Sequence, residues 1–372
     1  MRFLFFTNTP AHVHLYKHAV ATLRDEGHEV SILARDYGCT IDLLDWYGLS
    51  YTVYGPCGTT RWSLLRRLPE HYARIARHAL SFDPDLIFGM GAYAAHAGAL
   101  TRTPVVLVLD SEPTGLDHTI SMPFARTIVT PMAFRKDLGS NHYVFNGFKE
   151  CAYLHPNVYE PSVNVRKHLD LTPDERYVLV RLNAFGSHHD VGHGGFSADE
   201  RRKLITQLAE HATVFVSDEG GDFPFDSLPA RPFDIHPALL HDTLADASLL
   251  VADTQTMVTE AALLGTPAIR SNSFVGPEDM GNFLELEENN LVYNLRTFEE
   301  VLETAETVLS QPGVEREWKR KRDRYVSELV NPTKTITTLA VEAGDASAVE
   351  NLHRRSMHEQ QPIRKERSPQ QK

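Results

Sequence analysis

The sequence predicts an α/β protein with two lobes, each a parallel sheet covered by helices on both faces. Short apolar runs alternate with helical patterns through both halves of the chain, and the connections between them are short. A stretch with several prolines and little periodicity, residues 146–174, separates the two halves. A chain of 372 residues is also long for one hydrophobic core. We therefore expect an N-terminal domain at 1–150, a crossover at 151–174 and a C-terminal domain at 175–343.

The elements of the first half follow from apolar runs and from helical periodicity. Each expected strand is a run of four or five residues, most of them apolar. The first helix has an amphipathic pattern and ends before Gly27, because glycine readily adopts the left-handed conformation that closes a helix. Strands are expected at residues 3–6, 29–33, 51–54, 85–88 and 105–109, and helices at 14–26, 40–46, 63–80 and 92–100.

The same alternation restarts after the crossover. Both halves open with a strand and a polar loop that carries histidines, RFLFFTNTPAHVH and RYVLVRLNAFGSHH, which suits two Rossmann-like lobes facing each other across a cleft. Residues 344–372 are polar without a periodic apolar face, so a disordered tail is expected there. Strands are expected at 177–180, 213–216, 248–252 and 268–270, and helices at 198–211, 237–246, 297–309 and 317–329. A further helix is expected to carry Glu260 and to end at Gly265.

Composition and charge exclude several classes of function. The net charge of −12 argues against nucleic acid as a partner, because there is no basic surplus to displace counterions. The three cysteines are widely spaced and fit a reducing compartment. Asn8 and Pro10 interrupt the N-terminal apolar run too early for a signal peptide, and no run reaches the ~18 residues of a membrane span. We expect a cytoplasmic protein; peripheral membrane contact and a homodimer are both compatible with the sequence.

The segment 246–278 combines a strand, a polar loop and a helix start. An apolar run at 248–252 leads into Asp-Thr-Gln-Thr and then into a helix that carries Glu260. Free N–H groups and the helix dipole favour phosphate at such a place, and a carboxylate just inside the helix can accept hydrogen bonds from a ribose. This pattern points to a sugar nucleotide. The alternative for Glu260 is stabilisation of the helix dipole, and the alternative for the threonines is a role as caps or turn residues. As ligands, Thr254, Thr256 and Thr259 would hold a diphosphate.

Other candidate residues lie in loops that follow expected strands, where ligands bind in open parallel sheets. After the first strand come Asn8, His12 and His14, and either histidine is a candidate base or a capping or interfacial residue. Asp110 follows the strand at 105–109 and is a candidate catalytic carboxylate or a turn residue. In the second half, Asn183 and His188 begin a glycine-rich loop. Glycine-rich surroundings favour a ligand-gating or solvated loop over a metal site, so we expect no metal there.

The chain resembles a known superfamily in these same segments. The stretch DASLLVADTQTMVTEAALLGTPAIRSNSFVGPE resembles the donor-binding segment of GT-B enzymes, particularly UDP-N-acetylglucosamine 2-epimerases. The N-terminal pattern TNTPAHVHLYKHAVATLRDEGHEVSILARDYG resembles a set of uncharacterised, mostly archaeal proteins related to them, and that likeness extends to about Ala343. The resemblance implies a GT-B fold and adds Arg270 and Glu278 as substrate-binding candidates. The matching residues are Glu260-Ala261, Gly265-Thr266-Pro267, Arg270 and Pro277-Glu278.

One departure from the epimerase pattern changes the expected chemistry. Those enzymes carry His-Gly-Asp before a small-residue helix, whereas this chain has Phe88-Gly89-Met90, and their catalytic glutamate has only an approximate counterpart in Asp110 or Glu112. The first hypothesis is therefore a metal-independent GT-B glycosyltransferase without a cofactor, which uses a UDP-sugar in cell-surface or glycoconjugate synthesis. The second lobe would bind the donor, and the first would bind the acceptor. The alternatives are a UDP-sugar epimerase or hydrolase, and a non-catalytic sugar-nucleotide-binding protein.

Overall fold

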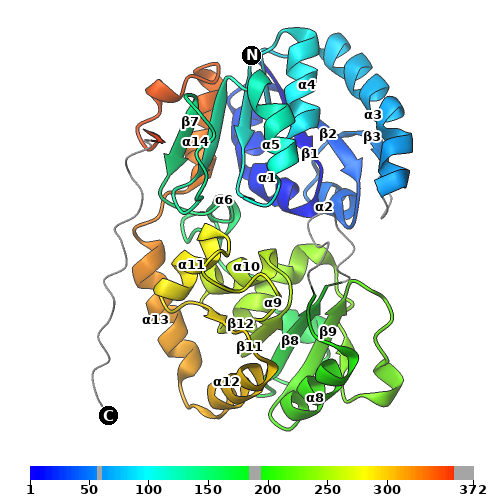
Figure 1. Cartoon of the computed structure of the whole chain (residues 1–372), viewed down its shortest axis with the longest axis vertical. Coiled ribbons are helices and arrows are strands. Elements are labelled where there is room, and N and C mark those ends of the chain that lie inside the picture. The colour runs from blue at the N-terminus through cyan, green and yellow to red at the C-terminus, as the bar shows by residue number, and fades with distance from the viewer. Residues whose placement is uncertain (57–60, 184–193, 356–372) are drawn as a thin grey trace.

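A computed structural model of the chain describes residues 1–56, 61–183 and 194–355, and these form two lobes stacked along the long axis of the molecule (Figure 1). The first sheet has eight strands in the order β14-β7-β6-β5-β4-β1-β2-β3, and all neighbours are parallel except β14 and β7. Its strands are β1 (Arg2–Thr7), β2 (Glu29–Asp36), β3 (Thr52–Pro56), β4 (Leu86–Gly89), β5 (Val105–Val108), β6 (Thr127–Pro131), β7 (His142–Phe145) and β14 (His353–Arg354).

Helices cover both faces of this sheet, as the apolar runs predict. The first begins earlier than expected, at Pro10, because proline is favourable in the first helical turn, where its missing N–H costs nothing. The helices of the first lobe are α1 (Pro10–Asp25), α2 (Thr40–Trp46), α3 (Arg61–Phe82), α4 (Ala92–Thr101), α5 (Gly115–Ser121) and the short η1 (Met122–Phe124).

The strands β6 and β7 were not predicted, because polar residues interrupt their apolar patterns. Thr130 on β6 and His142 on β7 are buried, and their side chains hydrogen-bond to each other at 2.9 Å. Thr127 is also buried and donates its hydroxyl to the carbonyl of Gly344 at 2.6 Å. Polar groups that satisfy one another can occupy a core strand at little cost, but a single sequence does not show the pairing.

The second lobe contains a parallel sheet of six strands in the order β10-β9-β8-β11-β12-β13. Its apolar runs are buried on both faces, which agrees with a sheet covered by helices. The strands are β8 (Tyr177–Leu182), β9 (Thr213–Asp218), β10 (Arg231–Pro232), β11 (Leu249–Ala252), β12 (Ala268–Arg270) and β13 (Tyr293–Asn294). The helices are α8 (Ala198–Ala209), η2 (Phe225–Ser227), η3 (Pro237–Leu239), α9 (Leu240–Asp246), α10 (Thr256–Leu264), α11 (Gly281–Glu288), α12 (Phe298–Ser310) and α13 (Val314–Val326).

The chain passes between the lobes twice, and the two passages are bonded to each other. The first contains α6 (Cys151–Leu154) and α7 (Val165–His168), and the second leads from α13 to α14 (Pro332–Val341). Asn146 donates from its side chain to the carbonyl of Glu328 at 2.8 Å, and the N–H of Val330 donates to the carbonyl of Asn146 at 2.7 Å. The hinge between the lobes therefore consists of two adjoining segments.

The C-terminal part of the chain returns to the first lobe. Helix α14 contacts α1, whereas the sequence alone assigns residues up to 343 to the second lobe (Figure 1). The expectation of disorder from Gly344 is wrong for residues 344–355, which form η4 (Ala346–Ala348) and β14. The backbone of Arg355 donates to the carbonyl of His142 at 2.9 Å, so pairing with β7 orders this segment. Residues 356–372 lie outside the described part of the chain.

The two lobes also touch where the first sheet faces α11. One carboxylate oxygen of Glu112 accepts from the backbone N–H groups of Arg135 and Gly281, both at 3.1 Å. The Arg135 side chain donates to the carbonyls of Pro277 and Asp279, both at 3.1 Å. We call these five residues the interlobe contact. No helix within the described residues is long and apolar enough to cross a membrane.

The interlobe contact leaves no room for a side chain at Gly281, and this generates a prediction. A Cβ atom there would lie 1.7 Å from the carbonyl oxygen of Ala133. We expect Gly281→Ala to lower the free energy of unfolding by about 1–3 kcal/mol, because the backbones must separate, and to increase the radius of gyration. Denaturant unfolding and small-angle X-ray scattering measure the two effects.

Gly115 provides the matched control, because it is also the first residue of a helix and a Cβ there would meet only the Lys136 side chain, at 3.9 Å. Gly115→Ala should change stability by less than about 0.5 kcal/mol. Equal stability of the two variants would contradict the close approach at Gly281.

Candidate functional site

A cavity of about 250 Å³ lies between the lobes, at the carboxyl ends of the strands of the second sheet. This is where open parallel sheets bind ligands. The second lobe supplies residues that follow β8, β9, β11 and β12, and the first lobe supplies two residues that follow β5. The lining residues are Ser111, Pro113, Arg181, Asn183, Glu219, Thr254, Gln255, Thr256, Met257 and Phe274. We call this the interlobe cavity.

The start of α10 forms one wall of the interlobe cavity. Thr256 is the first helical residue, and the side chain of Gln255, which precedes it, makes no capping hydrogen bond. The N–H groups of the first turn are thus available to an anion, which the helix dipole also favours. Thr254, just before the helix, has a buried hydroxyl without a hydrogen-bond partner in the described structure. An unpaired buried hydroxyl beside an uncapped helix start is suited to bind phosphate oxygens.

Asp253 fixes the loop that precedes α10. Its side chain accepts from the backbone N–H of Asn183 at 2.7 Å, and its carbonyl accepts from the side chain of Asn272 at 2.9 Å. Burial raises the pKa of the Asp253 carboxyl to about 6, although the Asn183 N–H opposes the shift. Asp253 thereby holds the loops after β8 and β12 against the start of α10, and it gives the cavity a defined shape.

Arg181 supplies positive charge at the interlobe cavity. Its guanidinium donates to the hydroxyl of Ser217 at 2.6 Å and forms an ion pair with Glu219, which also lines the cavity. The arginine side chain is 22% exposed, so a ligand can reach it. An arginine beside a helix start is a favourable arrangement for a diphosphate.

The other residues predicted in the second lobe occupy different places. Thr259 is buried, and its hydroxyl accepts from the side chain of Asn282 at 3.4 Å. Arg270 is fully buried and bonded to Asp279 at 2.6 and 3.2 Å, so it does not face the cavity. Glu278 is exposed in the loop before α11. His188 lies outside the described residues, as does most of its loop.

In the first lobe, Asp110 belongs to a cluster of buried charges at the carboxyl ends of the strands. Lys149, which follows β7, forms an ion pair with Asp110 and lies 3.7 Å from the carboxylate of Glu150. Burial raises the pKa of Glu150 to about 7, an effect that Lys149 opposes and Asp110 reinforces. Nearby carboxylates raise the pKa of the Lys149 ammonium. The Asp110 side chain is 22% exposed and is the most accessible of the three. We call Asp110, Lys149 and Glu150 the lysine–carboxylate cluster.

His12 lies in the first turn of α1, close to this cluster. Burial, then the charges of Lys149 and Arg35, lower the pKa of His12 to about 3, so the ring is neutral at pH 7. Its Nδ1 accepts from the backbone N–H of Asn8 at 3.2 Å, which places the ring proton on Nε2. Asn8 is in turn held by Tyr54, whose hydroxyl donates to its side-chain oxygen at 2.8 Å. His12 is thus arranged as a hydrogen-bond donor.

His14 and Glu260 meet in a second buried group, which joins the lobes. One oxygen of Glu260 accepts from the Tyr153 hydroxyl at 2.8 Å and lies 3.1 Å from His241 Nε2. The ring of His14, from α1, lies 4.6 Å from that of His241. Burial lowers the pKa of His14 well below its usual value, and His241 and Lys17 add to the shift. We call His14, Tyr153, His241 and Glu260 the Glu260 cluster.

Sequence reasoning missed Lys149, Glu150 and Arg181. Lys149 and Glu150 follow β7, and without that strand they read as part of the crossover. The run HYVF before NGFKE was the available signal. Arg181 is the penultimate residue of β8 and lines the interlobe cavity, whereas the rule for parallel sheets points to the loops that follow the strands.

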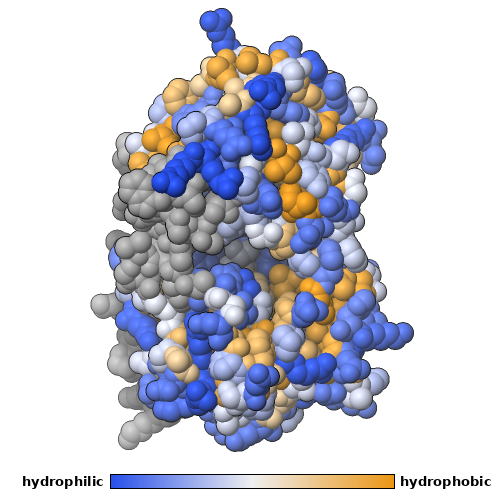
Figure 2. Space-filling model, turned by 90° about the vertical axis from the view of Figure 1, so that its right-hand side faces the viewer, coloured by the Kyte–Doolittle hydropathy of each residue, from blue (hydrophilic) through white to orange (hydrophobic). Residues whose placement is uncertain are grey.

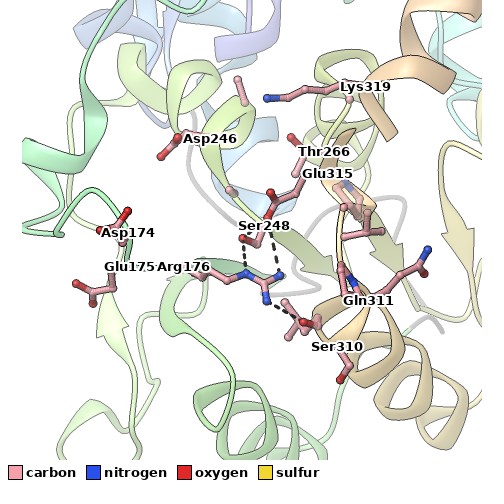
Figure 3. A pocket seen from close by; sticks show the side chains of 18 of the residues that line it. Asp174, Glu175, Arg176, Asp246, Ser248, Thr266, Ser310, Gln311, Glu315 and Lys319 are labelled. Carbon is pink, nitrogen blue, oxygen red and sulfur yellow. Dashed lines mark hydrogen bonds and ion pairs between the residues drawn. The ribbon is translucent and has the colours of Figure 1, made fainter. Parts of the chain in front are cut away.

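A larger cavity, of about 430 Å³, lies at the opposite edge of the second sheet, at the amino ends of its strands (Figure 3). Its polar groups satisfy one another. Arg176 donates to Ser248 at 3.4 Å and to the carbonyl of Leu309 at 2.8 Å, and Ser248 donates to Glu315 at 2.8 Å. The interlobe cavity is therefore the better candidate for a ligand.

Comparisons with known proteins agree with the two-lobed architecture. A family model described as "Protein of unknown function (DUF354)" matches residues 3–343. The uncharacterized protein MJ0665 of Methanocaldococcus jannaschii is 25% identical over 278 residues, which cover 71% of this chain and 79% of that protein.

Among solved structures, UDP-GlcNAc 2-epimerase from Neisseria meningitidis, bound to UDP-GlcNAc, superposes with a TM-score of 0.62 at 12% identity. The match covers 92% of this chain and 99% of that one. The glycosyltransferase SnogD from Streptomyces nogalater also gives a TM-score of 0.62, at 18% identity, over 92% and 99% of the two chains. These similarities confirm the predicted GT-B fold.

The raised pKa of Glu150 predicts a pH dependence of stability. A carboxyl whose pKa is raised from 4.5 to about 7 by folding binds a proton more tightly in the folded state. Its contribution to stability therefore falls as pH rises from about 4.5 to about 7. Glu150→Gln should gain stability relative to the wild type across this window, on the order of 1 kcal/mol per unit of pKa shift.

Denaturant unfolding of both proteins at several pH values measures this difference. Glu306→Gln, at an exposed position of α12, is the control and should show no trend with pH. A constant difference between wild type and Glu150→Gln from pH 4 to 8 would contradict the assigned shift.

Proposed function

Because the chain belongs to the family described as protein of unknown function DUF354, we infer its activity from the site and propose that it is a glycosyltransferase with a nucleotide-diphospho-sugar donor. The observation that carries the proposal is the wall of the interlobe cavity. An uncapped helix start, the unpaired hydroxyl of Thr254 and the guanidinium of Arg181 converge there. Together they match the charge and the acceptor oxygens of a diphosphate.

A uridine nucleotide is the donor we favour. Support comes from the Neisseria epimerase, which has the same fold and was solved with UDP-GlcNAc. Glu260 remains our candidate for binding the ribose. Its carboxylate is buried and does not line the interlobe cavity, so this assignment rests on its place in the second turn of α10, after the wall of the cavity.

The acceptor would bind on the first-lobe side, beside the lysine–carboxylate cluster. Asp110 is the most exposed carboxylate of that cluster, so we assign it as the base that removes the proton of an acceptor hydroxyl. The acceptor oxygen then bonds to the anomeric carbon, and the bond to the diphosphate breaks. The helix start at Thr256 and Arg181 stabilise the departing charge. His12, a donor through Nε2, would orient a substrate oxygen instead of acting as the base.

A sugar-nucleotide epimerase or hydrolase is the second candidate, favoured by one observation. Glu150, with a pKa of about 7, and Asp110 both contact the Lys149 ammonium, so proton donors and acceptors are present without any acceptor substrate. The products separate the two functions, because an epimerase or hydrolase yields an isomerised or free sugar with no acceptor added.

The donor site predicts an unusual pair of effects for Thr254→Val. Removing a buried hydroxyl that has no partner should leave the free protein as stable as before or more stable. The same change should weaken nucleotide binding by about tenfold or more, because a hydrogen bond to a charged phosphate is lost. A thermal-shift panel of UDP-, GDP-, dTDP- and CMP-sugars measures both effects.

Thr335→Val is the matched control, because the Thr335 hydroxyl is also buried without a described partner but belongs to α14, in the first lobe. It should bind nucleotide like the wild type. If none of the nucleotide sugars raises the melting temperature of the wild type, the donor site is wrongly assigned.

Asp110→Asn tests the acceptor side separately. We expect turnover to fall by about 10²–10⁴-fold with the donor-induced thermal shift retained, since the amide cannot accept a proton but the donor wall is intact. Asp25→Asn, at an exposed position at the end of α1, should keep full activity. Retained turnover in Asp110→Asn would assign the base elsewhere, and nucleotide binding by a wild type without turnover would indicate a non-catalytic binding protein.

A further inference from the structure

Helix α3 is strongly basic in a chain that is acidic overall. It contains five arginines and one glutamate, whereas the net charge of the chain is −12. The glutamate, Glu70, is bonded to Arg74 at 2.5 Å. Arg66, Arg67, Arg74 and Arg77 are all exposed. The helix therefore presents a local positive charge that opposes the charge of the rest of the molecule.

Exposed apolar side chains gather on the helices beside α3. Leu116, Ile120 and Phe124 recur every four residues along α5 and η1, and their exposed fractions are 78%, 41% and 46%. Leu80, near the end of α3, and Leu100, near the end of α4, are 59% and 52% exposed. Scattered apolar residues are ordinary on a protein surface, but five of the twelve large ones exposed in the described chain share this helical layer.

The basic and apolar parts form one continuous face. Tyr72 of α3 donates its hydroxyl to His96 Nδ1 of α4 at 2.7 Å, and His96 Nε2 lies 3.0 Å from the carbonyl of Ile120. The ring of His96 also lies 5.4 Å from that of Phe124. Helix α4 contacts both α3 and α5 (Figure 1), and the side of the molecule that carries α3 shows hydrophilic residues next to hydrophobic ones (Figure 2).

We propose that this face of α3, α4, α5 and η1 docks on the surface of an anionic lipid bilayer. Arginines attract anionic headgroups, and apolar side chains beside them enter the boundary between headgroups and acyl chains. Nucleic acid would match the arginines, but it would leave Leu116, Ile120 and Phe124 without an apolar partner. The inference goes beyond the proposed function, since it concerns where the protein acts and does not depend on which reaction it catalyses.

Docking through this face would place the bilayer next to the interlobe cavity. Ser111 and Pro113 line the interlobe cavity, and α5 begins two residues after Pro113. Leu116, the most exposed apolar residue of the face, thus lies next to the first-lobe wall of the cavity. A bilayer bound to this face adjoins the side on which we place the acceptor.

Co-sedimentation of the full chain with vesicles tests the proposal. Vesicles of equimolar phosphatidylglycerol and phosphatidylcholine should pellet the protein at low salt, and vesicles of phosphatidylcholine alone should not. The double variant Arg66→Glu/Arg67→Glu should bind at least about tenfold more weakly, because it replaces attraction by repulsion. The triple variant Leu116→Ser/Ile120→Ser/Phe124→Ser should also weaken binding and should remove the part that persists at high salt.

The control is Arg320→Glu/Arg324→Glu, which reverses two exposed arginines on α13 in the second lobe and should bind vesicles like the wild type. Melting temperatures and nucleotide binding confirm that each variant is folded, and they keep this test separate from that of the proposed function. Equal loss of binding in the control, or no binding of the wild type to anionic vesicles, overturns the proposal. A wild-type dimer that dissociates in the triple variant, without vesicle binding, assigns the face to a second copy of the chain instead.

Discussion

The arrangement of the two lobes depends on a buried carboxylate that segments from across the chain share. Glu260 of α10 accepts from Tyr153, in the first passage between the lobes, and contacts His241 of α9, while His14 of the first lobe packs against both rings. A buried charge must keep its partners, because stripping them away costs several kcal/mol. The requirement fixes where α1, α6, α9 and α10 stand relative to one another, and so fixes the walls of the cleft.

Charged groups elsewhere in the cleft are also paired with groups of opposite sign. Lys149 forms ion pairs with both Asp110 and Glu150, and Arg181 forms one with Glu219 at the opposite wall. Groups of opposite sign are thus held a few ångströms apart in a partly dry space, where their interactions are stronger than in water. The pKa values of Lys149 and Glu150 are both raised, and perturbed ionisable groups are typical of functional sites. A ligand with its own negative charge would compete with Glu219 for Arg181 and would leave the lysine–carboxylate cluster intact.

Periodicity predicted most strands and helices of both lobes, and the rule for parallel sheets predicted the edge at which Asn183, Thr254 and Thr256 line a cavity. Periodicity did not predict β7, because His142 interrupts the apolar run of that strand. The His142 side chain is hydrogen-bonded to Thr130, a residue of a neighbouring strand. Because β7 was not predicted, Lys149, which follows it, was not recognised as a residue at the carboxyl end of a strand. The sequence pattern identified Glu260 as a candidate site residue. It did not predict the contact with Tyr153, which is 107 residues away in the sequence.

The return of α14 and β14 to the first lobe has a consequence for the order in which the protein is made. The first lobe is not one continuous stretch of chain, since α1 packs against a helix that begins only at Pro332 and β7 pairs with residues 353–354. During translation these segments emerge after the second lobe. The apolar flank of α1 therefore stays uncovered until the whole second lobe has been synthesised, and during that interval the nascent chain presents a surface that chaperones recognise.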